Sequence, residues 1–143
     1  MIDLGELQDK AEAGDARALY ELGLVHADGL RVEKDLERAV FYFRRAYELG
    51  LDEPIYALAR AYEEGGEGLD RDPIEAFFWW RQGAHWGRTE AVALACHKVG
   101  RAYAEGTVVV RDRLQAISWL EKAIDGGQTE AQALLNELKS QQD

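Results

Sequence analysis

Apolar residues recur with helical spacing along most of the chain, in segments separated by short loops that contain glycine. In residues 15–28 they recur at steps of three and four, which predicts an amphipathic helix. Its expected buried face carries Leu19, Leu22, Gly23 and His26. Residues 53–64 repeat this spacing and predict another helix of the same kind. Its expected buried face carries Ile55, Leu58, Ala59 and Tyr62.

Each of these helices is followed by a loop and then by a second helix that starts after an aspartate. One such helix is predicted over residues 36–49, with Gly50 as a left-handed C-cap. The N-cap position of the second helices is held by Asp35, Asp72 and Asp112. After Asp72, Pro73 suits the first helical position and Glu75 completes a capping box. A residue that recurs once per unit is explained by this structural role, rather than by an active site.

The helix pairs form three copies of one pattern. Ala39, Ala76 and Ala116 hold the same place in the copies, so the steps between copies are 37 and 40 residues. A period in this range is typical of helical solenoids. The predicted repeats cover residues 14–50, 51–87 and 88–127, between capping helices within residues 1–13 and 128–143.

The third repeat is longer than the second at one place. Ala59 follows Gly50 by nine positions, whereas Gly100 follows Gly87 by thirteen. Four residues are about one helical turn, so the helix over residues 89–105 is expected to be one turn longer than its counterparts. The final helix is expected over residues 129–140.

The repeated positions resemble those of the Sel1-like repeat, a relative of the tetratricopeptide repeat. In the first copy the matching residues are Leu22, Gly23, Gly29, Asp35, Ala39, Tyr42, Ala46 and Gly50. The third copy matches best, through Val99, Gly100, Tyr103, Gly106, Asp112, Ala116, Trp119, Ala123 and Gly127. The second copy has Ala59 for the family glycine and Gly83 for the family alanine, and both exchanges keep a small residue where helices pack closely.

This resemblance implies an all-α fold, an α/α superhelical solenoid of three helix-pair repeats with a capping helix at each end. It also implies an interaction scaffold, since such repeats bind many different protein partners. The physical argument agrees, because each helix pair leaves an apolar face that only the next pair buries. Tyr42, Trp79 and Trp119 are expected to fill the spaces between pairs, and Trp80 is expected in the core.

Composition restricts the partners. The formal net charge is −10, so nucleic acid and anionic membranes are not expected to bind. The N-terminal residues resemble neither a signal peptide nor a membrane anchor. The single cysteine, Cys96, excludes an internal disulfide framework and favours a reducing compartment, so a cytoplasmic location is expected.

The reactive residue types do not form a catalytic or metal-binding pattern. Cys96 aligns with core positions and is expected to be buried and inert, and His26 is expected to pack between helices. His85 lies near a helix end, where a cation is favourable. No nucleophile, base and oxyanion donor come together in the sequence, so neither an enzyme nor a cofactor or metal ion is expected.

The candidate partner-binding residues lie on the first helices of the repeats, off the buried stripe. In tetratricopeptide-like arrays these helices line the concave face, and the resemblance carries this expectation over. The candidate groove residues are Tyr20, Leu24, Tyr56, Arg60, Glu63, Glu64, His97, Arg101 and Glu105. Tyrosine and arginine are enriched in binding hot spots, although an ordinary solvated helix face is the alternative interpretation.

A second candidate surface is aromatic. Phe78 and Trp86 align with residues that are not apolar in every repeat, so both are expected to be partly exposed. The leading hypothesis is a protein or peptide partner in the groove of a monomer or weak homodimer. The alternative is a structural or self-associating module that uses Phe78 and Trp86.

Overall fold

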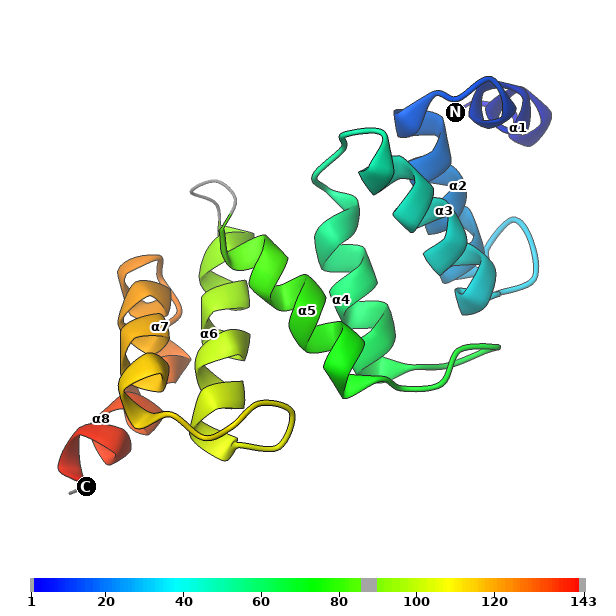
Figure 1. Ribbon diagram of the computed structural model, residues 1–143. Coiled ribbons are helices and arrows are strands. Elements are labelled where there is room, and N and C mark those ends of the chain that lie inside the picture. The colour runs from blue at the N-terminus through cyan, green and yellow to red at the C-terminus, as the bar shows by residue number, and fades with distance from the viewer. Residues whose placement is uncertain (1, 86–89, 142–143) are drawn as a thin grey trace. The chain divides into compact units, whose positions relative to one another are not determined.

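The computed structural model describes residues 2–85 and 90–141, and within these ranges it contains helices and no strands (Figure 1). The all-α fold class is confirmed. The helices of the first half are α1 (Leu4–Glu12), α2 (Ala16–Asp28), α3 (Leu36–Glu48) and α4 (Pro54–Glu64). The remaining elements are α5 (Pro73–Ala84), α6 (Glu90–Glu105), α7 (Arg113–Asp125), the 3-10 turn η1 (Thr129–Ala131) and α8 (Gln132–Ser140).

The recurring aspartates cap helices, as predicted. Asp35 Oδ1 accepts the Arg38 backbone N–H at 3.0 Å, and Asp112 Oδ1 accepts that of Gln115 at 3.0 Å. Asp72 Oδ1 accepts the backbone N–H of Glu75 at 3.1 Å. Each carboxylate thereby satisfies a donor that has no partner inside its helix, which is worth about 1 kcal/mol.

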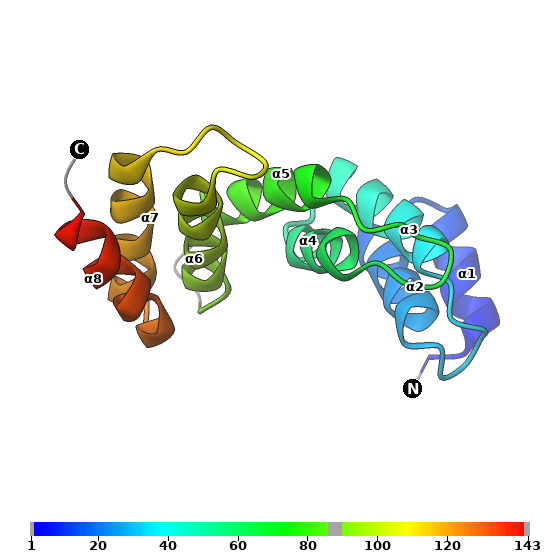
Figure 2. The same cartoon turned by 90° about the horizontal axis from the view of Figure 1, so that it is seen from below.

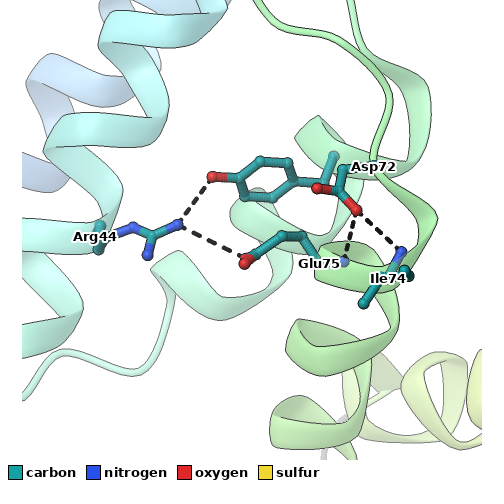
Figure 3. Close-up of polar contacts among 5 residues, drawn as sticks. Arg44, Asp72, Ile74 and Glu75 are labelled. Carbon is teal, nitrogen blue, oxygen red and sulfur yellow. Dashed lines mark hydrogen bonds and ion pairs between the residues drawn. The ribbon is translucent and has the colours of Figure 1, made fainter.

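At the start of α5 the backbone N–H of Asp72 has a partner other than Glu75. The Asp72 backbone N–H donates to the Tyr62 carbonyl at 2.8 Å. The Glu75 carboxylate lies 3.7 Å from the Arg44 guanidinium, as Figure 3 shows. The N–H that Glu75 was expected to satisfy is thus taken by the preceding helix. Glu75 instead forms an ion pair with Arg44 of α3.

The chain divides into two compact units, residues 1–76 and 77–143, and each is described by itself. In the first unit α1 and α3 both pack on α2 (Figures 1 and 2). The core between these helices contains Leu7, Ala11, Leu19, Leu22 and Ala46. Gly23 lies against the Phe43 ring and the Ala39 carbonyl, so the predicted close approach at a small residue is confirmed.

The loops of successive repeats also meet in the first unit. The Leu36 backbone N–H donates to the Glu67 carbonyl at 2.9 Å, which joins the start of α3 to the loop between α4 and α5. Lys34 Nζ lies 3.7 Å from the Glu67 carboxylate beside this bond.

In the second unit α7 lies between α6 and α8 (Figure 2). Trp79, Trp80 and Trp119 are buried, as predicted, together with Cys96 and Leu120. A Cβ atom at Gly100 would lie 2.8 Å from Leu120 Cγ, so the α6–α7 contact requires a glycine here.

Several boundaries and burial predictions are refined by the structure. α6 has 16 residues, whereas α2 has 13 and α4 has 11, so the predicted extra length is confirmed. The segment expected to form the final helix begins with the 3-10 turn η1 and continues as α8. Tyr42 and Tyr62 are half-buried rather than fully enclosed.

Candidate partner-binding surface

The first unit carries six of the candidate residues on α2 and α4. Leu24 is 41% exposed, and Arg60 and Glu64 are exposed as well. Tyr20, Tyr56 and Glu63 are half-buried. These positions lie off the buried stripe of each helix, which consists of residues such as Leu19 and Leu58.

Tyr20 is more integrated into the core than the sequence suggested. Its ring lies 5.8 Å from the Phe43 ring, and it packs against the core cluster of the first unit. The Arg17 guanidinium carbon lies 5.8 Å from the Tyr20 ring centroid, and Arg17 forms an ion pair with Glu53 at 2.6 Å. Burial, with the negative charge of Glu53, raises the pKa of the Tyr20 hydroxyl. Only part of the Tyr20 side chain is therefore available to a partner.

Tyr56 and Arg60 lie one turn apart on α4, so they share one side of that helix. Arg60 is exposed, and no described residue forms an ion pair with it. Glu63 and Glu64 follow one turn later. An unpaired guanidinium beside an aromatic ring suits a carboxylate-bearing ligand.

The second unit carries His97, Arg101 and Glu105 on successive turns of α6. Arg101 Nη2 lies 3.3 Å from Glu105 Oε1, so this guanidinium already has a carboxylate partner on its own helix. Burial lowers the pKa of His97, against the raising effect of its side-chain hydrogen bond with Gln128. That Arg101 and Arg60 share one surface remains a prediction.

A polar contact that the sequence analysis missed links three helices of the first unit (Figure 3). Arg44 Nη2 of α3 donates to the Tyr62 hydroxyl of α4 at 2.8 Å and lies 3.7 Å from Glu75 Oε2 of α5. In the second unit Arg81 Nη1 lies 3.5 Å from the Tyr103 hydroxyl, at the equivalent place. The signal was present in the sequence, since both the arginine and the tyrosine recur at the repeat spacing.

The chain matches the sequence profile of the Sel1 repeat at residues 16–51, 55–85 and 93–128. These segments make up well over half of the chain, and each corresponds to one predicted helix pair. The chain belongs to the Sel1 repeat family. The fold of this Sel1 repeat chain is an all-α helical repeat solenoid, as expected from its sequence.

Two solved structures support this assignment. A Sel1 repeat protein from Oxalobacter formigenes is 29% identical, with a TM-score of 0.70 over 96% of this chain and 99% of that one. A protective antigen of uropathogenic Escherichia coli with an SLR fold is 32% identical, with a TM-score of 0.78. That match covers 96% of this chain but only 28% of the antigen, so this chain corresponds to a small part of it.

A third relative matches over a shorter stretch. The secretory immunoglobulin A-binding protein EsiB of Escherichia coli is 44% identical over 45 residues. The match covers 32% of this chain and 9% of EsiB. Sel1 repeat proteins are generally protein-interaction scaffolds, and the Sel1 repeat is a non-catalytic fold, so binding is the activity to examine in this chain.

The second candidate surface of this Sel1 repeat chain is described only in part. Phe78 is 49% exposed, with its ring edge-on to Trp79 at 5.1 Å. Trp86 lies outside the described residues. Phe41 holds the same place as Phe78 in the preceding repeat and is 55% exposed, although the sequence analysis did not select it.

The remaining reactive residues pack into the repeats. Cys96 is buried, and burial raises the pKa of its thiol, which disfavours the reactive thiolate. His26 is buried and stacks on Tyr42 with ring centroids 5.6 Å apart. Within the described residues, no group of three metal-ligating side chains comes together, and no helix has the length and apolarity needed to cross a membrane.

Proposed function

We propose that this Sel1 repeat chain is a non-enzymatic scaffold that binds an extended or helical segment of a partner protein. The candidate binding residues lie on the exposed side of the first helices, which are α2 and α4 in the first unit and α6 in the second. The observation that carries the proposal is Arg60, an exposed arginine one turn from Tyr56 on α4, with no ion-pair partner among the described residues. On a chain of net charge −10, such a group is well placed to attract a carboxylate.

The neighbouring residues define the chemistry of the partner segment. Leu24 offers exposed apolar area, and Tyr20 and Tyr56 are half-buried tyrosines, a residue type enriched in binding hot spots. Glu63, Glu64 and Glu105 disfavour a uniformly acidic segment, so a segment of mixed charge is favoured. Arg101 contributes when a ligand carboxylate competes with Glu105 for its guanidinium.

The name of EsiB supports a binding role in general. The short match does not extend the immunoglobulin target to this chain. We propose that no cofactor or metal ion takes part in binding, and a cytoplasmic location remains a prediction.

The test is calorimetric titration of a partner identified by pull-down with the intact chain and mass spectrometry. The double variant Arg60→Ala with Arg101→Ala is expected to weaken binding at least tenfold, about 1.4 kcal/mol, with little change in melting temperature. The matched control is Arg31→Ala with Arg111→Ala, which removes two exposed arginines from the loops that follow α2 and α6. Equal affinities of wild type and the Arg60/Arg101 variant would exclude the first-helix surface as the binding site.

A second candidate function is self-association through the exposed ring of Phe78. It predicts a dimer whose population rises with concentration in analytical ultracentrifugation and falls in Phe78→Ala. A monomer at all concentrations contradicts it.

A further inference from the structure

A cavity of about 190 Å³ lies between α1, α2 and α3 of the first unit, away from the first-helix candidate residues. Its buried floor is apolar and consists of Ala11, Leu19 and Leu22. Phe41 and Tyr42 of α3 line one side. The exposed residues around it are Gln8, Glu12 and Arg45. The cavity is thus apolar inside and polar at its edge.

The aromatic wall of the cavity is supported from within the protein. Phe41 packs edge-on against Tyr42, with centroids 5.5 Å apart and planes at 70°. Tyr42 in turn stacks on the buried His26 ring. Phe41 nevertheless remains 55% exposed, so apolar area stays in water at a position that its neighbours hold in place. A partner that covered the Phe41 ring would bury this apolar surface, and no conformational entropy would be lost in fixing the ring because its neighbours already hold it.

Two arginines flank the aromatic pair on the same side of α3. Arg38, Phe41, Tyr42 and Arg45 follow one another at steps of three, one and three residues, which places them on one helix face. Both arginines are exposed, and no described residue forms an ion pair with either.

The nearby carboxylates only partly offset these two charges. Asp35 uses its carboxylate to cap α3, and Glu37 lines a hollow together with Arg38, Phe41 and Tyr42 but forms no ion pair with Arg38. Glu12 lies on the edge of the cavity but forms no ion pair with Arg45. The two guanidinium groups therefore stay available to an outside partner.

We propose that this α3 face and the adjoining cavity form a second docking site, for a peptide segment with one large apolar side chain flanked by carboxylates. The apolar side chain enters the cavity, whose volume is below the roughly 300–1,000 Å³ of small-molecule sites and suits a single anchor residue. Arg38 and Arg45 are seven residues apart, about 10 Å along the helix. An extended segment spans that distance with roughly three residues, so its acidic residues lie close to the anchor on both sides.

The experiment selects peptides from a random library displayed on phage against the full chain, with counter-selection on Gln8→Trp. Gln8 is exposed, so a tryptophan there obstructs the cavity without removing core contacts. The expected product is a set of peptides with Leu, Met or an aromatic residue flanked by Asp or Glu. Selection of no such peptide, or of basic ones, overturns the proposal.

A selected peptide is then synthesised and titrated calorimetrically into variants of the chain. Phe41→Ala, and separately Arg38→Glu with Arg45→Glu, are each expected to weaken its binding at least tenfold. Phe78→Ala is the matched control, because Phe78 holds the same place in the next repeat and is similarly exposed. Binding equally reduced by Phe78→Ala contradicts the assignment to the cavity.

Two further outcomes separate this site from the alternatives. Loss of peptide binding in the Arg60/Arg101 variant, with none in the α3 variants, supports the first-helix surface and overturns the second site. A dimer seen in ultracentrifugation and dissociated by Phe41→Ala identifies a second copy as the occupant and also overturns the proposal. Circular dichroism melts of all variants verify folding, and the Gln8→Trp comparison holds even if Phe41→Ala fails to fold.

Discussion

The two units make the same contact between consecutive helices, with different surroundings. In the first unit Arg44 donates to the Tyr62 hydroxyl at 2.8 Å and has the Glu75 carboxylate 3.7 Å away. In the second unit Arg81 lies 3.5 Å from the Tyr103 hydroxyl, and Gln115 stands at the place of Glu75. Tyr103 is instead more buried and meets the Phe77 ring edge-on at 5.9 Å. The contact between these helices is thus stabilised more by a charge-assisted hydrogen bond in the first unit, and more by apolar burial in the second.

The largest predicted effect concerns apolar burial in the second unit. Trp119→Ala is expected to lower the free energy of unfolding by roughly 3–5 kcal/mol, because the ring is buried between α7 and its neighbours. Its first-unit counterpart Tyr42 is half-buried, so Tyr42→Ala is expected to cost less. Urea denaturation followed by circular dichroism measures both. A loss below about 1 kcal/mol for Trp119→Ala would contradict its role in the core.

The next prediction separates the two arginine–tyrosine contacts. Tyr62→Phe is expected to destabilise by about 1 kcal/mol, because it removes an acceptor from a charged donor at good distance. Tyr103→Phe is expected to cost less, since the 3.5 Å contact is at the limit of a hydrogen bond. Equal losses in denaturant melts would show that the carboxylate of Glu75 adds nothing to the first contact.

The helix caps are expected to contribute alike in both units. Asp72→Ala and Asp112→Ala should each cost about 1 kcal/mol, because each exposes an unpaired backbone N–H at a helix start. Partner binding should be retained, which calorimetry can verify. Loss of binding by Asp72→Ala with an unchanged melt would assign this aspartate to the binding surface instead.

The smallest predicted effect is a pH dependence at His26. Burial, with Arg38, lowers its pKa in the folded state, so the unfolded chain binds more protons as pH falls below the ordinary value of 6.5. The contribution of neutral His26 to the free energy of unfolding is therefore fully present above pH 6.5, and it declines as the pH falls toward the folded-state pKa. His26→Tyr, which introduces the residue of the other two repeats, should flatten the pH dependence of the melting temperature between pH 5 and 7.

His97 titrates with the same sign in the second unit, because burial lowers its pKa too. The variant His97→Gln is the matched comparison for His26→Tyr. A slope that neither substitution changes would assign the pH dependence to other groups.

The repeats, the small residues at helix contacts and the capping aspartates could all be predicted, because each follows from local spacing in the sequence. The Arg44–Tyr62–Glu75 contact could not, since it depends on which of two possible partners Glu75 takes across helices. The cavity between α1, α2 and α3 was not predicted either, because it also depends on how helices pack in three dimensions. Its floor residues were selected as core, and only the three-dimensional packing of a short α1 leaves them reachable from outside.

The backbone bond from Leu36 to Glu67 gives this chain an internal reporter. An amide in the first turn of a helix normally has no partner within that helix and exchanges rapidly with solvent. The Leu36 amide instead donates to a carbonyl of the following repeat's loop, 31 residues away in sequence. Its hydrogen-exchange rate therefore measures how often the second repeat separates from the first, even while α3 itself stays folded.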